Sequence, residues 1–180
     1  SRLLRETTEI DLGVNTYPEL NLRTYVRGEK PGIYFFNLDA ADRLGVTIAR
    51  TLFELPYYRA EMRVDRGGET VSFESRRVHG GVPPCRFDAS YWPEGDRFRA
   101  DERPLPAFLT ERYRFYTEGD GSLYYGDVDH DPWPLHEAGA VVRENDLFAA
   151  NGFDHPGGAP RLHYSPGTDV TAGRIHRERR

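Results

Sequence analysis

The chain has 180 residues, which suits one domain with a sizeable core. Its hydrophobic content of 38% is low, but 13% of the residues are aromatic, so rings supply much of the apolar surface that can be buried. The formal net charge of −5 gives no basic field, which disfavours nucleic acid as a partner.

The first predicted elements are a hairpin and a helix. Residues 20–27 alternate between apolar and polar positions, and IYFFNL at 33–38 predicts a second, more buried strand after a turn. The segment 39–53 then changes to a helical period, with Asp39 as its predicted N-cap. Pro56 is expected to stop this helix.

The rest of the chain predicts short strands joined by tight turns. Strands are predicted at 58–64, 69–78, 85–92, 112–118, 123–130, 138–143 and 161–165, and short helices at 105–113 and 145–152. Turns at 93–96 and 118–122 are marked by glycine with proline or aspartate. We therefore expect an α+β fold with a mainly antiparallel sheet. It forms a single domain over 1–180, with a poorly defined segment 1–18 and a frayed tail at 171–180.

The composition also limits the chemistry and the location. Lys30 is the only lysine, so any mechanism that needs an amine nucleophile must use it. The single cysteine, Cys85, cannot form an intramolecular disulfide, which fits a cytoplasmic protein. No apolar run approaches the roughly 20 residues that cross a bilayer, so no membrane partner is expected. Glycine motifs for phosphate binding and for a nucleophile elbow are missing from the sequence, and we expect no cofactor.

The stretch DVDHDPWPLHE at 127–137 is the most metal-like part of the sequence. Asp127, Asp129 and Asp131 have the spacing of the first ligands of a calcium loop, but Pro132 stands where such a loop needs glycine. A strand would place the three aspartates on one face. We therefore expect a solvated acidic face here and no metal site.

The stretch FLTERYRFY at 108–116 carries a second charged pattern. As a strand it would place Arg112, Arg114 and Tyr116 on one face and Glu111, Tyr113 and Phe115 on the other. A glutamate among rings on an inner face is costly unless it is paired, so Glu111 would be an ion-pair partner or a site carboxylate. A network that serves only the architecture is the alternative interpretation.

Several strings taken together resemble the YqjF-like family of uncharacterised bacterial and archaeal proteins. They are ELNLRTYV, KPGIYFF, LDA, LPYY, FLTERYRFY, DHDPWPL and LHYSPGTDV, which follow one another from about Glu19 to Val170. The resemblance implies the fold of acetoacetate decarboxylase, a cone-shaped antiparallel β-barrel with peripheral helices and a central pocket. Family members usually have a longer N-terminal region, so either the N-terminus is missing here or the early fold differs.

The resemblance also gives a meaning to Tyr57 and Tyr58. In acetoacetate decarboxylases a strand and a helix lead into a proline and two lysines, and one lysine forms a Schiff base while its neighbour lowers its pKa. Here Pro56 is followed by the two tyrosines. A phenol cannot form an imine, so Schiff-base decarboxylation is not expected. A phenol can instead donate a hydrogen bond to a carbonyl or carboxylate, or act as a general acid.

The leading interpretation is a pocket for a small carbonyl or carboxylate compound. The candidate catalytic residues are Tyr57, Tyr58 and Glu111, and the candidate ligand-binding residues are Arg50, Arg112, Tyr113, His130 and Trp133. If the protein is an enzyme, we expect proton transfer or hydrolysis. One alternative is a non-catalytic module whose barrel is filled by its own rings, and the least favoured is a decarboxylase that uses Lys30. The sequence leaves open whether the chain forms a homo-oligomer.

Overall fold

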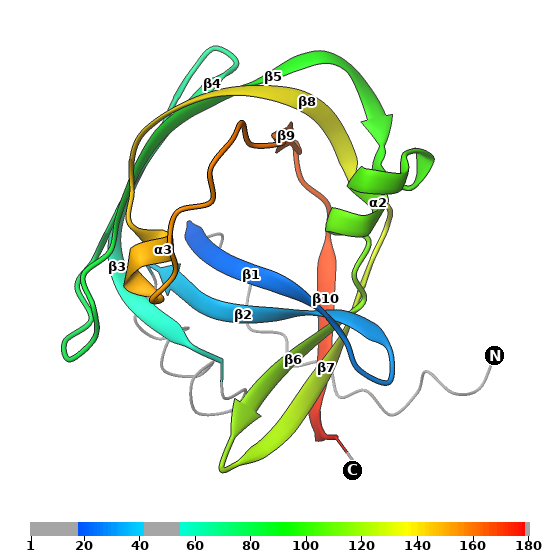
Figure 1. Cartoon of the computed structure of the whole chain (residues 1–180). Coiled ribbons are helices and arrows are strands. Elements are labelled where there is room, and N and C mark those ends of the chain that lie inside the picture. The colour runs from blue at the N-terminus through cyan, green and yellow to red at the C-terminus, as the bar shows by residue number, and fades with distance from the viewer. Residues whose placement is uncertain (1–17, 42–54, 179–180) are drawn as a thin grey trace.

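One strongly curved sheet makes up most of the computed structural model, which describes residues 18–41 and 55–178 (Figure 1). The strands are β1 (Glu19–Arg27), β2 (Pro31–Ala40), β3 (Tyr57–Gly67), β4 (Thr70–Arg77), β5 (Arg86–Arg99), β6 (Arg114–Gly119), β7 (Ser122–His130), β8 (Pro134–Asn145), β9 (His163–Tyr164) and β10 (Val170–Arg177). The short helices are η1 (Ala100–Glu102), α2 (Pro104–Thr110) and α3 (Leu147–Ala150). The predicted class, strands with few helices, is confirmed.

Strand β2 is the branch point of the sheet. It pairs with β1 in an antiparallel hairpin, and it pairs in parallel with β3 near its end and with β6 near its start. The strand order is β10-β7-β6-β2-β3-β4-β5-β8-β9, and the other described pairings are antiparallel. The mainly antiparallel sheet was therefore predicted correctly. The described pairings do not join β9 to β10, so the closed cone remains a prediction.

The turn between β1 and β2 is packed around one buried ring. The hydroxyl of Tyr116 donates to the carbonyl oxygen of Lys30 at 2.7 Å and accepts from the amide of Lys30 at 3.3 Å. A Cβ added at Gly28 would lie 2.5 Å from this hydroxyl, and one at Gly32 would lie 2.8 Å from the ring. The two glycines are needed because the backbone approaches Tyr116 this closely. The arrangement fixes the backbone position of Lys30.

Three sequence predictions are wrong within the described residues. Asp39 is not an N-cap, because β2 continues to Ala40. Most of the predicted helix, residues 42–53, lies outside the described residues. The turn predicted at 93–96 is part of β5, whose pairing with β8 has an irregularity between Glu94 and Phe98 that accommodates proline and glycine. The predicted frayed tail is strand β10 as far as Arg177, because it pairs with β7.

A membrane-spanning helix would need about 20 apolar residues. Throughout residues 18–41 and 55–178, no helix combines the length and the apolar character that crossing a membrane requires.

Candidate functional site

The structure places Tyr57 and Tyr58 at the start of β3, beside the end of β2. The register pairs Leu38 with Tyr57 and Asp39 with Tyr58. Because successive strand residues point to opposite faces, Tyr58 shares a face with Asp39 and Tyr57 lies on the other face. Arg50, the arginine expected near them, lies outside the described residues.

A buried ion pair lies beside Tyr58. Arg77 donates from Nε and Nη2 to the two carboxylate oxygens of Asp39, at 2.6 and 2.8 Å. The two side chains are only 2% and 1% exposed. The remaining Nη1 donates to the carbonyl oxygen of Pro83 at 3.1 Å, and the guanidinium carbon lies 4.5 Å from the centre of the Tyr58 ring. This bidentate geometry satisfies charges that would otherwise be costly to bury.

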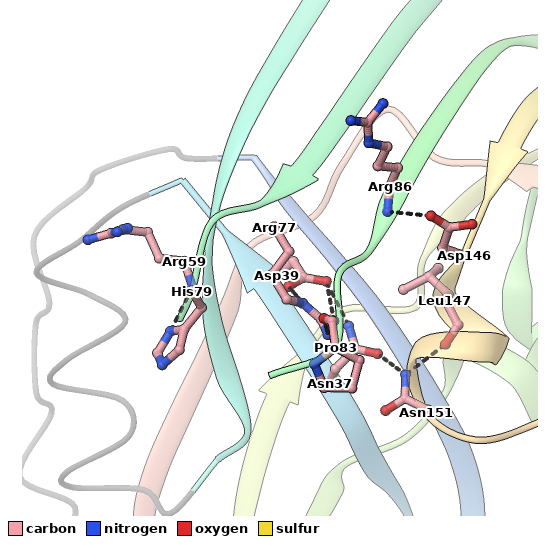
Figure 2. A network of polar contacts seen from close by, with 10 residues as sticks. All are labelled: Asn37, Asp39, Arg59, Arg77, His79, Pro83, Arg86, Asp146, Leu147 and Asn151. Carbon is pink, nitrogen blue, oxygen red and sulfur yellow. Dashed lines mark hydrogen bonds and ion pairs between the residues drawn. The ribbon is translucent and has the colours of Figure 1, made fainter. Parts of the chain in front are cut away.

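The ion pair belongs to a network that joins β2, β4 and α3 (Figure 2). Asn37 donates to Asp39 at 3.0 Å, and Asn151 donates to Asn37 at 2.7 Å and to the carbonyl oxygen of Leu147 at 2.8 Å. Cys85 is buried close by, and desolvation raises the pKa of its thiol to about 11. Since these polar groups satisfy one another, the network is primarily architectural.

Tyr57 contacts a different carboxyl group. Its hydroxyl donates to Glu19 Oε2 at 2.8 Å, and Asn21 donates to Glu19 Oε1 at 3.2 Å. Burial raises the pKa of Glu19, and the hydrogen bonds from Tyr57 and Asn21 oppose this shift only in part. The two tyrosines thus contact separate groups on the two faces of the sheet.

A cleft of about 760 Å³ lies between the β1–β2 turn, the segment that leads into β6, and strands β7 and β10. It contains three of the predicted site residues, Glu111, Arg112 and Tyr113. Its charged lining residues are Lys30, Glu111, Arg112, Arg114, Asp127 and Asp129. The cleft therefore contains both cationic and anionic side chains.

Arg112 is a cation of this cleft that makes no ion pair with another described residue. Its guanidinium carbon lies 4.4 Å from the centre of the Phe108 ring and 5.5 Å from that of Tyr25. Its Nε is buried without a hydrogen bond, and the ion pairs found among the described residues do not include Arg112. A guanidinium held against rings in this way keeps its N–H groups available for an oxygen ligand.

Arg114 is more deeply buried and is already paired. Its side chain, 5% exposed, donates to Asp127 from Nε at 2.6 Å and from Nη2 at 3.0 Å. The guanidinium also stacks on Tyr125 at 3.8 Å. Its Nη1 is buried without a hydrogen bond, and Glu29 Oε2 lies 3.7 Å away. A second guanidinium N–H group in the cleft wall is therefore unsatisfied.

Glu111 is the C-cap of α2, in line with the helix predicted at 105–113, and the alternative strand geometry does not apply to it because β6 begins only at Arg114. Its carboxylate accepts from the hydroxyl of Tyr113 at 2.6 Å, from the backbone amide of Trp133 at 3.1 Å and from the hydroxyl of Thr110 at 3.3 Å. The hydrogen bond to Glu111 raises the pKa of Tyr113 to about 12. Of the two roles predicted for Glu111, an ion-pair partner is not found among the described residues, and its carboxylate is hydrogen-bonded by neutral groups instead.

His130 and Trp133 pack beside this carboxylate. The ring of His130 stacks on Tyr113 with a centroid distance of 4.6 Å, and Trp133 meets His130 edge-on at 5.6 Å. The structure thus brings together Glu111, Tyr113, His130 and Trp133, with Arg112 adjacent in sequence. It separates all of them from Tyr57 and Tyr58.

Sequence reasoning missed Lys30 and Asp129 as residues that line the cleft. Sequence spacing gives no sign that the turn containing Lys30 meets β6 and β7. Asp127 and Asp129 do share a face of β7 as predicted, but Asp127 pairs with Arg114. In the part of the chain that the structure describes, no group of three or more His, Cys, Asp and Glu side chains is placed to hold a metal ion.

Two other hollows lie elsewhere on the described part of the chain. One, of about 370 Å³, lies over β3, β4 and β5, and charges in its wall pair with each other, as in Arg76 with Glu61. Another lies at the tip of the β6–β7 hairpin, beside Arg177 and Glu178. Neither contains a predicted site residue.

Comparison with known proteins identifies the family. The family model DUF2071, described as "Uncharacterized conserved protein", matches residues 7–169. The chain belongs to this family. It is also 44% identical over 159 residues to the "Uncharacterized protein YqjF" of Bacillus subtilis (strain 168), which confirms the resemblance. The match covers 88% of this chain but only 65% of the Bacillus protein.

The fold is similar to that of two solved acetoacetate decarboxylase structures. The enzyme from Legionella pneumophila aligns with a TM-score of 0.60 and 12% identity, over 93% of this chain and 69% of the enzyme. A second structure, titled "Structural Studies of Acetoacetate Decarboxylase", aligns with a TM-score of 0.55 and 12% identity, over 90% of this chain and 68% of the other. At this identity the likeness concerns the fold alone.

Proposed function

We propose that this DUF2071 member binds a small carbonyl or carboxylate compound in the cleft, with Arg112 holding the oxygen-bearing end of the ligand. The observation that carries the proposal is Arg112, a cleft-lining residue whose Nε is buried without a hydrogen bond and which makes no ion pair with another described residue. A volume of about 760 Å³ is typical of small-molecule sites. Carboxylates and carbonyls offer the oxygen acceptors that a guanidinium recognises.

If the ligand is also transformed, cofactor-independent proton transfer or hydrolysis is the class that these residues support. Tyr113 donates to Glu111 at 2.6 Å, so a proton can pass between a bound molecule, the phenol and the carboxylate. A pKa of about 12 keeps the phenol protonated at neutral pH, as a general acid must be. In this proposal Tyr58 supports the Asp39–Arg77 network and does not contact the ligand.

One observation favours a second candidate, decarboxylation through an imine. Lys30, the only lysine, lines the same cleft. It is exposed in a turn, however, whereas Schiff-base lysines are activated by desolvation or by a neighbouring cation. Borohydride treatment in the presence of 2-oxo and 3-oxo acids, followed by mass spectrometry, tests this candidate. An adduct in the wild type that is lost in Lys30→Arg would establish it in place of the leading proposal.

The proposed site is tested by ligand-observed NMR with a panel of small carboxylates and ketones. Arg112→Gln should weaken any hit by about 10- to 100-fold, because it removes a charge-assisted hydrogen bond worth roughly 1.5–3 kcal/mol. The matched control is Arg97→Gln, which changes an exposed arginine outside the cleft and should leave binding unchanged. Binding that survives Arg112→Gln but is lost in Tyr58→Phe would place the site beside β2 and β3 and refute the cleft.

A further inference from the structure

Charged residues of both signs line the same cleft and make no ion pair with another described residue. Arg114 and Asp127 neutralise each other through two hydrogen bonds. Of the other four charged lining residues, Lys30 and Arg112 are cations and Glu111 and Asp129 are anions, and the ion pairs found among the described residues include none of them. From this arrangement we infer that the natural ligand is a small zwitterion, such as an amino acid, which carries an ammonium group as well as a carboxylate. The inference rests on the proposed function, because it adds a second group to the carboxylate that Arg112 binds.

The cationic part of the cleft is positioned by aromatic side chains. Arg112 is held by its contacts with Phe108 and Tyr25. The backbone of Lys30 is fixed by the hydroxyl of Tyr116, which contacts both its amide and its carbonyl oxygen. Arg114 adds a buried guanidinium N–H without a hydrogen bond. A bound carboxylate would provide acceptors for this part of the cleft.

The anionic part of the cleft lies around Tyr113. Glu111 accepts the hydrogen bond of this phenol, and Asp129 is an exposed carboxylate on β7 that makes no ion pair with a described residue. The pKa of Tyr113 is raised first by the hydrogen bond to Glu111, and Asp101 and Asp129 add to the shift, so the local potential is negative. An ammonium group here would gain both opposite charge and an aromatic neighbour.

A plain carboxylate would fit this cleft less well than a zwitterion. It would pair with Arg112, but Glu111 and Asp129 would then repel the ligand and would still have no cationic partner. Specific sites commonly combine attraction to the right ligand with repulsion of the wrong one. An ammonium group converts this repulsion into attraction. The mixed charges therefore favour a ligand whose two ends differ in sign.

The test uses three sets of matched probes and measures their affinities by ligand-observed NMR. Each set contains an amino acid, its 2-oxo acid and its amide, for alanine, leucine and phenylalanine. At least one amino acid should bind the wild type about 10-fold more tightly than its 2-oxo acid and its amide. Asp129→Asn should weaken the amino acid about 10-fold and leave the 2-oxo acid unchanged, while Arg112→Gln should weaken both. Asp96→Asn changes an exposed carboxylate outside the cleft and is the matched control.

The outcomes separate this inference from the proposed function. A 2-oxo acid that binds as tightly as its amino acid and does not respond to Asp129→Asn refutes the zwitterion but leaves the carboxylate site intact. An amide that binds as tightly as its amino acid refutes the carboxylate contact that the zwitterion needs but still fits a carbonyl ligand of Arg112. A panel without any binding refutes both proposals. Thermal unfolding of each variant checks that the fold is retained, which is expected because Asp129 is exposed.

Discussion

The buried pair of Asp39 and Arg77 gives the sharpest prediction for stability. Asp39→Asn keeps the shape of the side chain but removes its charge, so the Arg77 guanidinium stays buried with no counter-ion. The two side chains are 1% and 2% exposed, so solvent screens their interaction very little. Breaking a buried pair by changing one partner costs about 3–5 kcal/mol. This is a large part of the 5–15 kcal/mol that is typical of a folded domain.

Equilibrium urea unfolding, followed by circular dichroism and tryptophan fluorescence, measures the loss. Adding Arg77→Met to Asp39→Asn removes the stranded charge, so the double variant should be more stable than Asp39→Asn alone. The matched control is Asp101→Asn, which breaks the exposed pair with Arg99 and should give no resolvable change. If Asp39→Asn costs less than about 1 kcal/mol, as at an exposed pair, the claim that Arg77 is desolvated is refuted.

Two further predictions concern the groups whose pKa is raised by burial. The folded state favours the protonated form of Glu19, because its pKa is raised by burial. The stability that Glu19 contributes is therefore fully present below its unfolded pKa of about 4.3. This stability is lost as the pH rises through the pKa of Glu19 in the folded protein. The side chain of the Glu19→Gln variant stays neutral at every pH. Urea unfolding between about pH 4 and 7 should therefore show that the free energy of unfolding of this variant improves relative to that of the wild type as the pH rises. A difference between the two proteins that does not change with pH would contradict this. Cys85 is buried with a pKa of about 11, so its reaction with Ellman's reagent at about pH 8 should be at least ~100-fold slower in the native protein than in guanidinium. Equal rates in the two states would show that the thiol is accessible.

Local patterns allowed most of the strands to be predicted. β4 alternates so that Val71, Phe73, Ser75 and Arg77 are buried, which is the period of two that the sequence shows. The N-cap prediction for Asp39 failed because an aspartate before a helical pattern looks the same whether it caps a helix or pairs with an arginine. Its partner is 38 residues away in sequence, and only the sheet brings the two together.

The site was predictable only where its residues are close in sequence. Glu111 and Tyr113 are two residues apart and meet through their own side chains. Lys30 and Thr171 reach the same cleft because β6 pairs with both β2 and β7, and β7 also pairs with β10. These pairings depend on the order of strands in the sheet, which short-range patterns do not contain.

The two tyrosines after Pro56 illustrate how sheet geometry limits an analogy drawn from sequence. Consecutive residues in β3 point to opposite faces, so Tyr57 and Tyr58 do not enter one pocket together. Tyr57 contacts Glu19, whereas Tyr58 packs on the guanidinium of Arg77. Because the fold resembles acetoacetate decarboxylase and neither phenol can form an imine, the likeness extends to the scaffold and not to Schiff-base chemistry at these positions. The ligand contacts that we propose therefore lie in the cleft that Arg112 lines and not at these two tyrosines.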